Sequence, residues 1–437
     1  MQLFLPFLIL IFCCIPILID AQIENASIIL IHIIMAIICV RNLFSNSKRP
    51  YSLFVVLNIF FLFFMCIAPV VQLNNGVALF GTKFSFDNYY DTSTTLLLVL
   101  IITTCFYGIC SKKYDSIFGH SNVLQTNNKL KRISLKKEIL MLFVSSSIGL
   151  ICLYLNHFNI SSLLFRGGEL TTRVSTSQIF TLIFDNFFKP MPLVIFLASL
   201  VIGIKHKFTK ALLFVFLLIS VPPTGVARLY AAAVYIPVVL FLLPFLKKRN
   251  NFVLLFCFGI LVIFPLFNIF REYSAKVSFD ISSSFSQFKD LHFDAYSMMM
   301  RVIKDDIVTY GNQLLGALLF WVPRSIWPSK PIGSGFFVAE QTNLSFNNIS
   351  MPFWGEGYIN FGYFGVAIFA IVLAVFIART DSKFWNITVK QGRNLDTILY
   401  YLLLGLLMFV LRGDMMSGTA YTCGIVCSYY FIKKIVL

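Results

Sequence analysis

The sequence is poor in charge, and poorest in acid. Charged residues make up 12% of the 437 residues, against roughly 25% in soluble domains. The chain holds 19 acidic residues and five histidines but 49 phenylalanines, and its mean hydropathy is +0.83. Too few charged side chains are available to cover a water-exposed surface. The composition therefore excludes a soluble globular protein and indicates a membrane protein.

Several chemical signatures are also missing. No Walker A, Rossmann glycine pattern, D-x-D or G-x-S-x-G motif occurs. All ten cysteines lie in or at the edge of apolar runs, and Cys423 and Cys427 do not have the C-x-x-C spacing. We therefore expect no disulfide framework in the loops, no cofactor and no metal requirement. No internal repeat is visible, which argues against a transporter built from inverted halves.

Apolar runs dominate what is present. A helix needs about 20 apolar residues to cross the hydrocarbon core of a bilayer. Twelve runs approach or reach this length, at about 2–20, 26–40, 52–72, 93–110, 138–156, 187–204, 208–223, 226–246, 252–270, 362–378, 396–411 and 417–432. The sequence therefore predicts an all-α integral membrane protein with about twelve transmembrane helices.

Basic residues fall mainly in alternate loops. Of the 35, 22 lie in residues 41–49, 112–137, 205–210, 247–249, 379–393 and 433–434. Only four acidic residues accompany them, so this side has a net charge of +18 and the other side −2. The positive-inside rule places the basic side and both termini in the cytoplasm. The excess of basic residues thus indicates how the chain is oriented in the membrane. Because no separate basic domain with interleaved aromatics is present, nucleic acid is not an expected partner.

Residues 271–361 form the long polar interruption, which is predicted to face outward. They hold eight of the 19 acidic residues and separate a first bundle of about nine spans, 1–270, from the last three spans, 362–437. Concentrated ionisable groups in one extramembrane segment indicate that the chemistry lies there.

Two helical pieces are expected inside this outer loop. Residues 285–306 are predicted to form an amphipathic helix, with Asp290, Asp294 and Arg301 on one polar face. His292 and Asp294 would point about 160° apart on such a helix, so they are not expected to bind one metal ion. Residues 313–322 are too short to span and are predicted to be interfacial or re-entrant.

Basic side chains in the outward-facing loops suggest anion binding. Arg166 and Arg173 bracket a glycine pair, so their guanidinium groups and the loop N–H groups are able to bind one anion, although a local Arg–Glu pair is the alternative. Arg228 follows a Pro-Pro helix break at membrane depth, where an arginine needs a partner or a ligand. Arg324 and Lys330 lie on a turn stiffened by three prolines, which favours an anion site over lipid headgroup contact.

Two further candidates lie beside later helices. Glu356 has Gly355 and Gly357 as neighbours, which are expected to leave room for a bulky substrate. Arg412, at the outer end of the eleventh run, is expected to form an ion pair with Asp414 or to join the cationic site.

Together, these segments resemble the Wzy-type O-antigen or oligosaccharide repeat-unit polymerases of the bacterial inner membrane. The matching residues are 292–296 (HFDAY), 323–331 (PRSIWPSKP), 355–362 (GEGYINFG) and 412–414 (RGD). The resemblance in topology covers the whole chain, whereas the specific motifs are concentrated in residues 291–365.

The resemblance implies a multi-pass GT-C-type glycosyltransferase. Such an enzyme moves a growing glycan from undecaprenyl diphosphate to a sugar hydroxyl of an incoming lipid-linked unit at the periplasmic face. Implied partners are these lipid-linked donor and acceptor glycans, membrane lipid and a chain-length-regulating membrane protein. The implied diphosphate-binding residues are Arg166, Arg173, Arg228, Arg324, Lys330 and Arg412, and the implied base is Glu356 or Asp294, with Glu356 preferred.

Two rivals remain open. An O-antigen ligase would transfer the same donor to lipid A–core. A polysaccharide-lipid flippase, which is not an enzyme, would also present cations to a diphosphate, but it should carry its charges inside the spans along a central path. Here most of the candidate cationic residues lie in outer loops.

The division of basic residues predicts opposite exposure of two loops. In a background without accessible thiols, a cysteine replacing Ser283 should react with an impermeant maleimide added from the periplasmic side. A cysteine replacing Asn127 should react only after the membrane is permeabilised. Labelling of the Asn127 variant in intact cells would reverse the predicted orientation.

Overall fold

The computed structural model describes residues 4–19, 21–45, 49–119, 134–165, 173–204, 206–266, 286–347, 349–391 and 394–436. Within these ranges the chain is helical and contains no β-strand. Each of the twelve apolar runs lies on a helix or on a continuous helical series. These are α1 (Phe4–Leu18), α2 (Ala26–Ser45), α3–η2–α4 (Leu53–Asn74), α5 (Phe86–Gly119), α6 (Leu135–Leu155), α8–η4–α9 (Gln178–Ile202), α10 (Lys207–Ser220), α11 (Arg228–Leu242), α12–η6–α13 (Arg249–Leu266), α17 (Phe353–Lys383), α18 (Asp396–Arg412) and α19 (Met415–Val436).

Seven helical stretches among the described residues are long and apolar enough to cross a membrane. They are Ile23–Ser45, Leu53–Asn74, Phe86–Gly119, Leu135–Leu155, Gln178–Ile202, Arg249–Leu266 and Phe353–Thr388. Many of their apolar side chains are exposed on the outside of the bundle. So much exposed apolar surface is stable only in contact with the hydrocarbon of a membrane. The chain is therefore a helical, multi-pass membrane protein.

The stretch Leu53–Asn74 is the central helix of the bundle, and its whole apolar window is buried. It joins α3 (Leu53–Phe60), the π-helical η2 (Phe61–Ile67) and α4 (Ala68–Asn74). Because its side chains are apolar on every face, it packs against other helices all round. Pro69 has no N–H for the carbonyl one turn earlier, which accounts for the wide π turns before it.

Residues 286–304 of the polar segment contribute Phe288, Phe293 and much of α14 (Ala295–Lys304) to the same core. They form η8 (Ser286–Lys289), η9 (Leu291–Phe293) and α14. Gln72 of the central helix donates through Nε2 to the carbonyl oxygens of Phe288 and Phe293, at 2.8 and 3.1 Å. These two carbonyl oxygens therefore accept from a side chain and not from a backbone N–H of a continuous helix. The predicted single helix over 285–306 was therefore wrong.

The environment of α14 also differs from the prediction. Residues 295–302 are all buried, on the polar as well as the apolar face. Tyr296 donates to the carbonyl of Tyr89 at 3.0 Å, and its hydroxyl lies 2.8 Å from that of Ser93. His32 Nε2 is 3.0 Å from the same serine oxygen. This chain of contacts joins α14 to α5 and, through Ser93, to α2.

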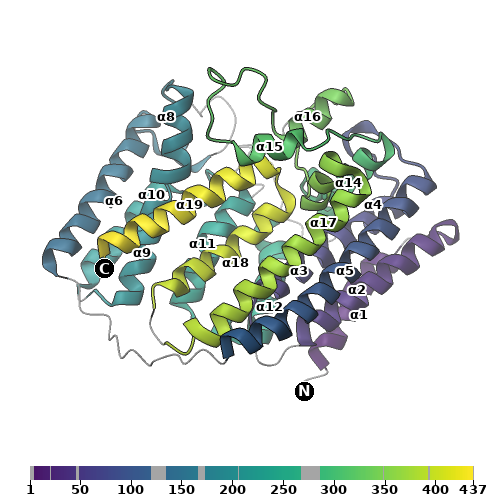
Figure 1. Cartoon of the computed structure of the whole chain (residues 1–437), viewed down its shortest axis with the longest axis horizontal. Coiled ribbons are helices and arrows are strands. Elements are labelled where there is room, and N and C mark those ends of the chain that lie inside the picture. The colour runs from purple at the N-terminus through teal and green to yellow at the C-terminus, as the bar shows by residue number, and fades with distance from the viewer. Residues whose placement is uncertain are drawn as a thin grey trace.

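Figure 1 shows two ends of the bundle. The short helices α14, α15 (Asn312–Leu318) and α16 (Ser334–Gln341) lie at the top of the view. The C-terminal ends of α5, α17 and α19 lie toward the lower left, with the C-terminus on that side. With seven residues, α15 is too short to span, as predicted for 313–322.

A buried polar network ties the helices together at the end of the bundle away from α14–α16. Its hub is Asp381 of α17, which is fully buried. The Asp381 carboxylate accepts from the N–H groups of Leu53 and Phe54, at 3.0 and 3.3 Å, and from the hydroxyls of Tyr400 and Tyr107, at 2.7 and 3.2 Å. One carboxylate thus fixes the first turn of α3 to α5, α17 and α18.

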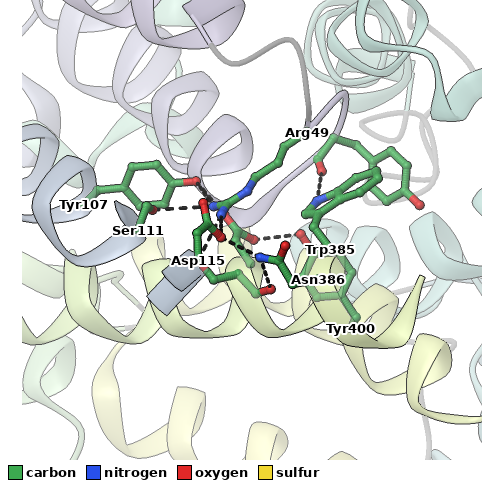
Figure 2. A network of polar contacts seen from close by, with 10 residues as sticks. Arg49, Tyr107, Ser111, Asp115, Trp385, Asn386 and Tyr400 are labelled. Atoms are coloured by element: carbon green, nitrogen blue, oxygen red, sulfur yellow. Dashed lines mark hydrogen bonds and ion pairs between the residues drawn. The ribbon is translucent and has the colours of Figure 1, made fainter. Parts of the chain in front are cut away.

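Arg49 supplies the positive charge of this network, as Figure 2 shows. Its guanidinium donates to Tyr107 Oη, Ser111 Oγ and Asp115 Oδ1 on α5, and to Ser382 Oγ on α17. The Arg49 side chain is 4% exposed, whereas that of Asp115 is 44% exposed. The strongly desolvated charges are therefore Arg49 and Asp381.

We expect Asp381→Ala to destabilise the bundle severely, because the two N–H groups of α3 and the hydroxyls of Tyr107 and Tyr400 lose their buried acceptor, and Arg49 loses a nearby negative charge. Removing one partner of a buried charge pair costs about 3–5 kcal/mol. Asp381→Asn keeps an acceptor oxygen and should cost less. Unfolding of purified protein in detergent measures both. Asp115→Asn is the control, with an expected cost below about 1 kcal/mol because Asp115 is partly solvated. Equal effects of Asp381→Ala and Asp115→Asn would contradict this assignment.

Candidate functional site

The candidate site is built around a break in α17. Phe361 and Gly362 have non-helical backbone angles, and Gly362 has φ of 60°. They divide α17 into a short first arm, 353–360, and a long second arm. A Cβ added at Gly365 would lie 2.0 Å from the carbonyl oxygen of Gly357, so the two arms touch through their backbones. Glycine is required at both positions by this close approach.

This contact corrects the prediction about the glycines beside Glu356. A Cβ at Gly357 would lie 2.8 Å from the Gly365 carbonyl oxygen, and one at Gly355 would lie 2.8 Å from Met351 Sδ. The space beside Glu356 is therefore filled by the protein's own backbone and side chains. The two glycines allow tight packing and leave no room there for a sugar.

The first arm ends in the interior, where its carbonyl groups need donors. The loop before α15 supplies them. Thr309 N–H donates to Ile359 O at 2.6 Å, and Gly311 N–H donates to Asn360 O at 3.0 Å. The Asn360 side chain accepts from Leu314 N–H at 2.7 Å. These bonds fix the arm that carries Glu356.

Glu356 is 1% exposed, and both of its carboxylate oxygens are engaged. Ser334 Oγ, at the start of α16, donates to Oε2 at 2.7 Å. The N–H of Met415, at the start of α19, donates to Oε1 at 2.7 Å. The carboxylate thus joins three helices that are far apart in the sequence.

Asp294 is also almost fully buried, with 2% exposure, and it precedes α14. It accepts from Ser350 Oγ at 2.5 Å and forms an ion pair with Arg412 Nη2 at 2.9 Å. The sequence placed Asp294 and Arg301 on one polar helix face, and the structure gives the two side chains different partners. Arg301 instead donates to Thr82 Oγ1 at 2.7 Å.

The turn Arg412–Asp414 connects the two candidate carboxylates. Arg412 binds Asp294, and the next helix begins with Met415, whose N–H binds Glu356. The Asp414 carboxylate accepts from the N–H and hydroxyl of Ser417, at 3.0 and 2.8 Å, so it caps α19. Arg412 is thus paired with Asp294 and not with Asp414. Three of the four family-like segments meet at this turn.

The fourth segment, the proline-rich turn 323–331, lies next to this point. A Cβ at Gly333 would be 3.1 Å from Asp414 Oδ1, and one at Gly316 would meet both Pro331 and Met416. The turn therefore packs between α15 and the start of α19.

The cations of this turn are occupied by the turn itself. Arg324 donates to the carbonyls of Lys330 and Pro331, at 2.6 and 3.1 Å. Lys330 Nζ donates to the carbonyls of Phe320 and Val322, at 2.5 and 3.0 Å. Partial burial, together with the nearby Arg324 guanidinium, lowers the pKa of Lys330. Both side chains stabilise the conformation of the turn, and an anion would have to compete with these carbonyls.

Arg228 approaches the same region from α11. It donates to the Phe264 carbonyl at 3.1 Å, and its guanidinium lies 4.9 Å from the Phe264 ring centre. Its charge also acts on Asp290, just before η9. Burial raises the pKa of Asp290, and Arg228 opposes this shift. The structure thus groups Arg228 and Arg412 near the segment that carries Asp294.

Arg173 lies in a different place. It forms a two-pronged ion pair with Asp185, at 2.9 and 3.0 Å, on the wall of a cavity of about 260 Å³ that Lys189 and Cys152 also line. The sequence predicts an anion or a glutamate as its partner, whereas the structure shows an aspartate. Arg166 lies outside the described residues.

Two polar residues of the site, Ser334 and Ser350, are not predicted from the sequence. A serine in a loop carries no local signal of its partner. Among the described residues, no three His, Cys, Asp or Glu side chains converge as a metal site would require.

The Asp294–Arg412 pair makes a testable structural prediction. Arg412→Met should leave the buried Asp294 uncompensated, Asp294→Asn should leave the partly buried Arg412 so, and the double variant should be less destabilised than the sum. We expect a coupling free energy of about 1–3 kcal/mol, measured by unfolding in detergent. The Arg173–Asp185 pair, with side chains 38% and 18% exposed, is the control and should couple by less than about 1 kcal/mol. Additive effects at Asp294 and Arg412 would contradict the pairing.

The chain matches no protein-family model, no curated protein and no solved structure. Its function is therefore argued from its motifs and from the geometry described above.

Proposed function

We propose that this protein polymerises undecaprenyl-diphosphate-linked oligosaccharide repeat units at the periplasmic face of the bacterial inner membrane. The observation that carries the proposal is the meeting of the family-like segments at the Arg412–Asp414 turn. Asp294, Glu356 and the turn 323–331 come from separate parts of the chain, yet each contacts or adjoins this turn. Convergence of such residues at one end of a membrane bundle supports a catalytic site for a membrane-bound substrate.

The reaction transfers a glycan between two lipid carriers. A hydroxyl oxygen of the incoming unit forms a bond to the anomeric carbon of the growing glycan. The bond from that carbon to the diphosphate oxygen breaks, and undecaprenyl diphosphate leaves with the bonding electron pair. The hydroxyl proton passes to a carboxylate. Such a reaction needs a base at the acceptor and cations at the leaving diphosphate.

Arginine is suited to the second requirement because its planar guanidinium binds two phosphate oxygens at once. Arg412 is the best-placed candidate, since it lies at the turn between the two carboxylates. Its Nε is buried and has no hydrogen-bond partner within the described residues, so the guanidinium retains a donor for an anion. Arg228, Arg324 and Lys330 are proposed to assist. Arg173 and Arg166 are proposed to contact the lipid-linked glycan from the neighbouring loop.

Glu356 remains our proposed base, with a specific geometric requirement. An acceptor hydroxyl must come within about 2.6–3.2 Å of a carboxylate oxygen to transfer its proton. Since Ser334 Oγ occupies that position at Oε2, the acceptor hydroxyl would take the place of the serine hydroxyl. Asp294 is the second candidate, but its ion pair with Arg412 favours a positioning role.

The proposal includes a topology of twelve spans with both termini in the cytoplasm and residues 271–361 in the periplasm. The charge asymmetry supports this orientation, as does the position of α14–α16 at the end of the bundle away from the C-terminus (Figure 1). An O-antigen ligase would need the same donor site, so the two activities are separated by their products. A deletion strain of a polymerase should attach one repeat unit to lipid A–core, whereas a ligase or flippase deletion should attach none.

Glu356→Gln should lower polymerisation by about 10²-fold or more, because the amide oxygen still accepts from the Met415 N–H and the amide nitrogen donates to Ser334 Oγ, but the amide takes up no proton. The test is the glycan ladder of a complemented deletion strain, with the protein level in the membrane measured alongside. Ser334→Ala is the matched control and should retain a ladder, since its hydroxyl is displaced by the acceptor. Asp294→Asn should weaken polymerisation less than Glu356→Gln.

A normal ladder from Glu356→Gln at equal protein level would remove Glu356 as the base. Loss of the ladder in Ser334→Ala alone would indicate that the serine itself acts on the substrate.

A further inference from the structure

A second feature of the bundle is a groove of about 430 Å³ between α5 and α17, which Figure 1 shows side by side. The proposed transfer reaction does not use it. One end of the groove is polar and is lined by Asp91, Thr95 and Tyr363. The other end is apolar and is lined by Leu98, Ile102 and Val366. Along α5, Asp91 and Ile102 are separated by about 16 Å at 1.5 Å per residue.

The groove opens on a surface that faces hydrocarbon. Leu98 is 59% exposed, and further along the same helices Ile109 and Val372 are 66% and 58% exposed. Both helices belong to stretches long and apolar enough to span a bilayer. An occupant therefore comes from the membrane. A groove of this volume holds one small molecule or one acyl chain. It is too small for a helix, which is about 10–12 Å across.

The charge at the polar end selects the kind of lipid. The Asp91 carboxylate has no hydrogen-bond or ion-pair partner in the described part of the chain. The negative charges of Asp91 and Asp306 both act on the Tyr363 hydroxyl. Asp306 itself accepts from Tyr358 Oη at 2.9 Å, and among the described residues it has no cationic partner. A further negative charge here would be repelled, so a diphosphate or an anionic headgroup fits poorly, whereas an ammonium group is attracted.

We propose that this groove binds a bilayer phospholipid whose headgroup carries a primary amine. Its ammonium group lies against the Asp91 carboxylate, and one acyl chain lies between Leu98 and Val366. The site is distinct from the candidate transferase site, because it is acidic and faces lipid. Its proposed ligand is an ordinary component of the bilayer and not the glycan carrier.

The experiment measures lipid binding to purified protein in detergent by native mass spectrometry. Phosphatidylethanolamine and phosphatidylglycerol with identical acyl chains are titrated separately. We expect wild-type protein to bind the ethanolamine lipid roughly three- to tenfold more tightly, as an ion pair at a partly solvated site permits. Asp91→Asn should bring the two affinities together. Asp87→Asn is the control, because Asp87 lies on the same helix but does not line the groove.

Two further variants fill the apolar end. Leu98→Trp and Ala367→Phe should each reduce binding of both lipids at least fivefold, since Ala367 also lines the groove. Leu150→Trp on α6, at a position 57% exposed, should leave binding unchanged. Thermal unfolding of each variant identifies any that is misfolded. If one of the two filling variants is misfolded, the other is used for the binding comparison.

Equal binding of the two lipids by wild-type protein would overturn the proposal, as would a preference that survives in Asp91→Asn. Unchanged binding in both filling variants would do the same. A third titration uses undecaprenyl diphosphate. Tighter binding of this lipid than of the ethanolamine lipid, lost in Leu98→Trp, would also overturn the proposal and would identify the groove as the path of the glycan carrier. These readouts do not depend on transferase activity.

Discussion

Pairing of buried charge is the constraint on which this arrangement depends. In an interior this apolar, an ionised side chain without a partner costs several kcal/mol. Asp381, Asp294 and Glu356 are each 2% exposed or less, and each is satisfied by donors from helices distant in the sequence. These bonds fix the positions of the helices relative to one another. Apolar packing alone would leave the helices free to slide.

The two ends of the bundle meet this constraint differently. At one end, the Asp381 carboxylate accepts four hydrogen bonds, two from backbone and two from tyrosines, and Arg49 provides the opposing charge. Backbone donors at a helix start and rigid rings give this network little freedom to change, so it acts as a structural tie. At the other end, Glu356 also accepts from one backbone donor, the Met415 N–H, but serine hydroxyls and one arginine make the other side-chain contacts of Glu356 and Asp294, and such groups are replaceable by the hydroxyls and phosphates of a substrate.

The break in α17 links this chemistry to the membrane surface. On its first arm, α17 carries Glu356 inside the protein, and just after the break it places Tyr363 at the lipid-facing groove. The contact of Gly357 with Gly365 makes this sharp change of direction possible within one helix. One element therefore borders both the candidate catalytic site and the groove that we assign to a phospholipid, and a lipid in the groove would brace the second arm of α17.

The amino-acid sequence by itself determined the class of the protein and the places of its apolar helices. Both follow from composition and from runs of consecutive residues, which are local properties of the chain. It also indicated the segments at 292–296, 323–331, 355–362 and 412–414, which the structure brings close together. The basic residues in alternate loops further predict the orientation of the chain in the membrane.

Only the tertiary structure decided which side chain meets which. Asp294 pairs with Arg412 across 118 positions, whereas Arg301 donates to Thr82. The glycines beside Glu356 serve contact between backbones and not access for a sugar. Helical periodicity relates residues three or four positions apart, whereas these contacts depend on how distant helices pack, and no local pattern in the sequence contains that information.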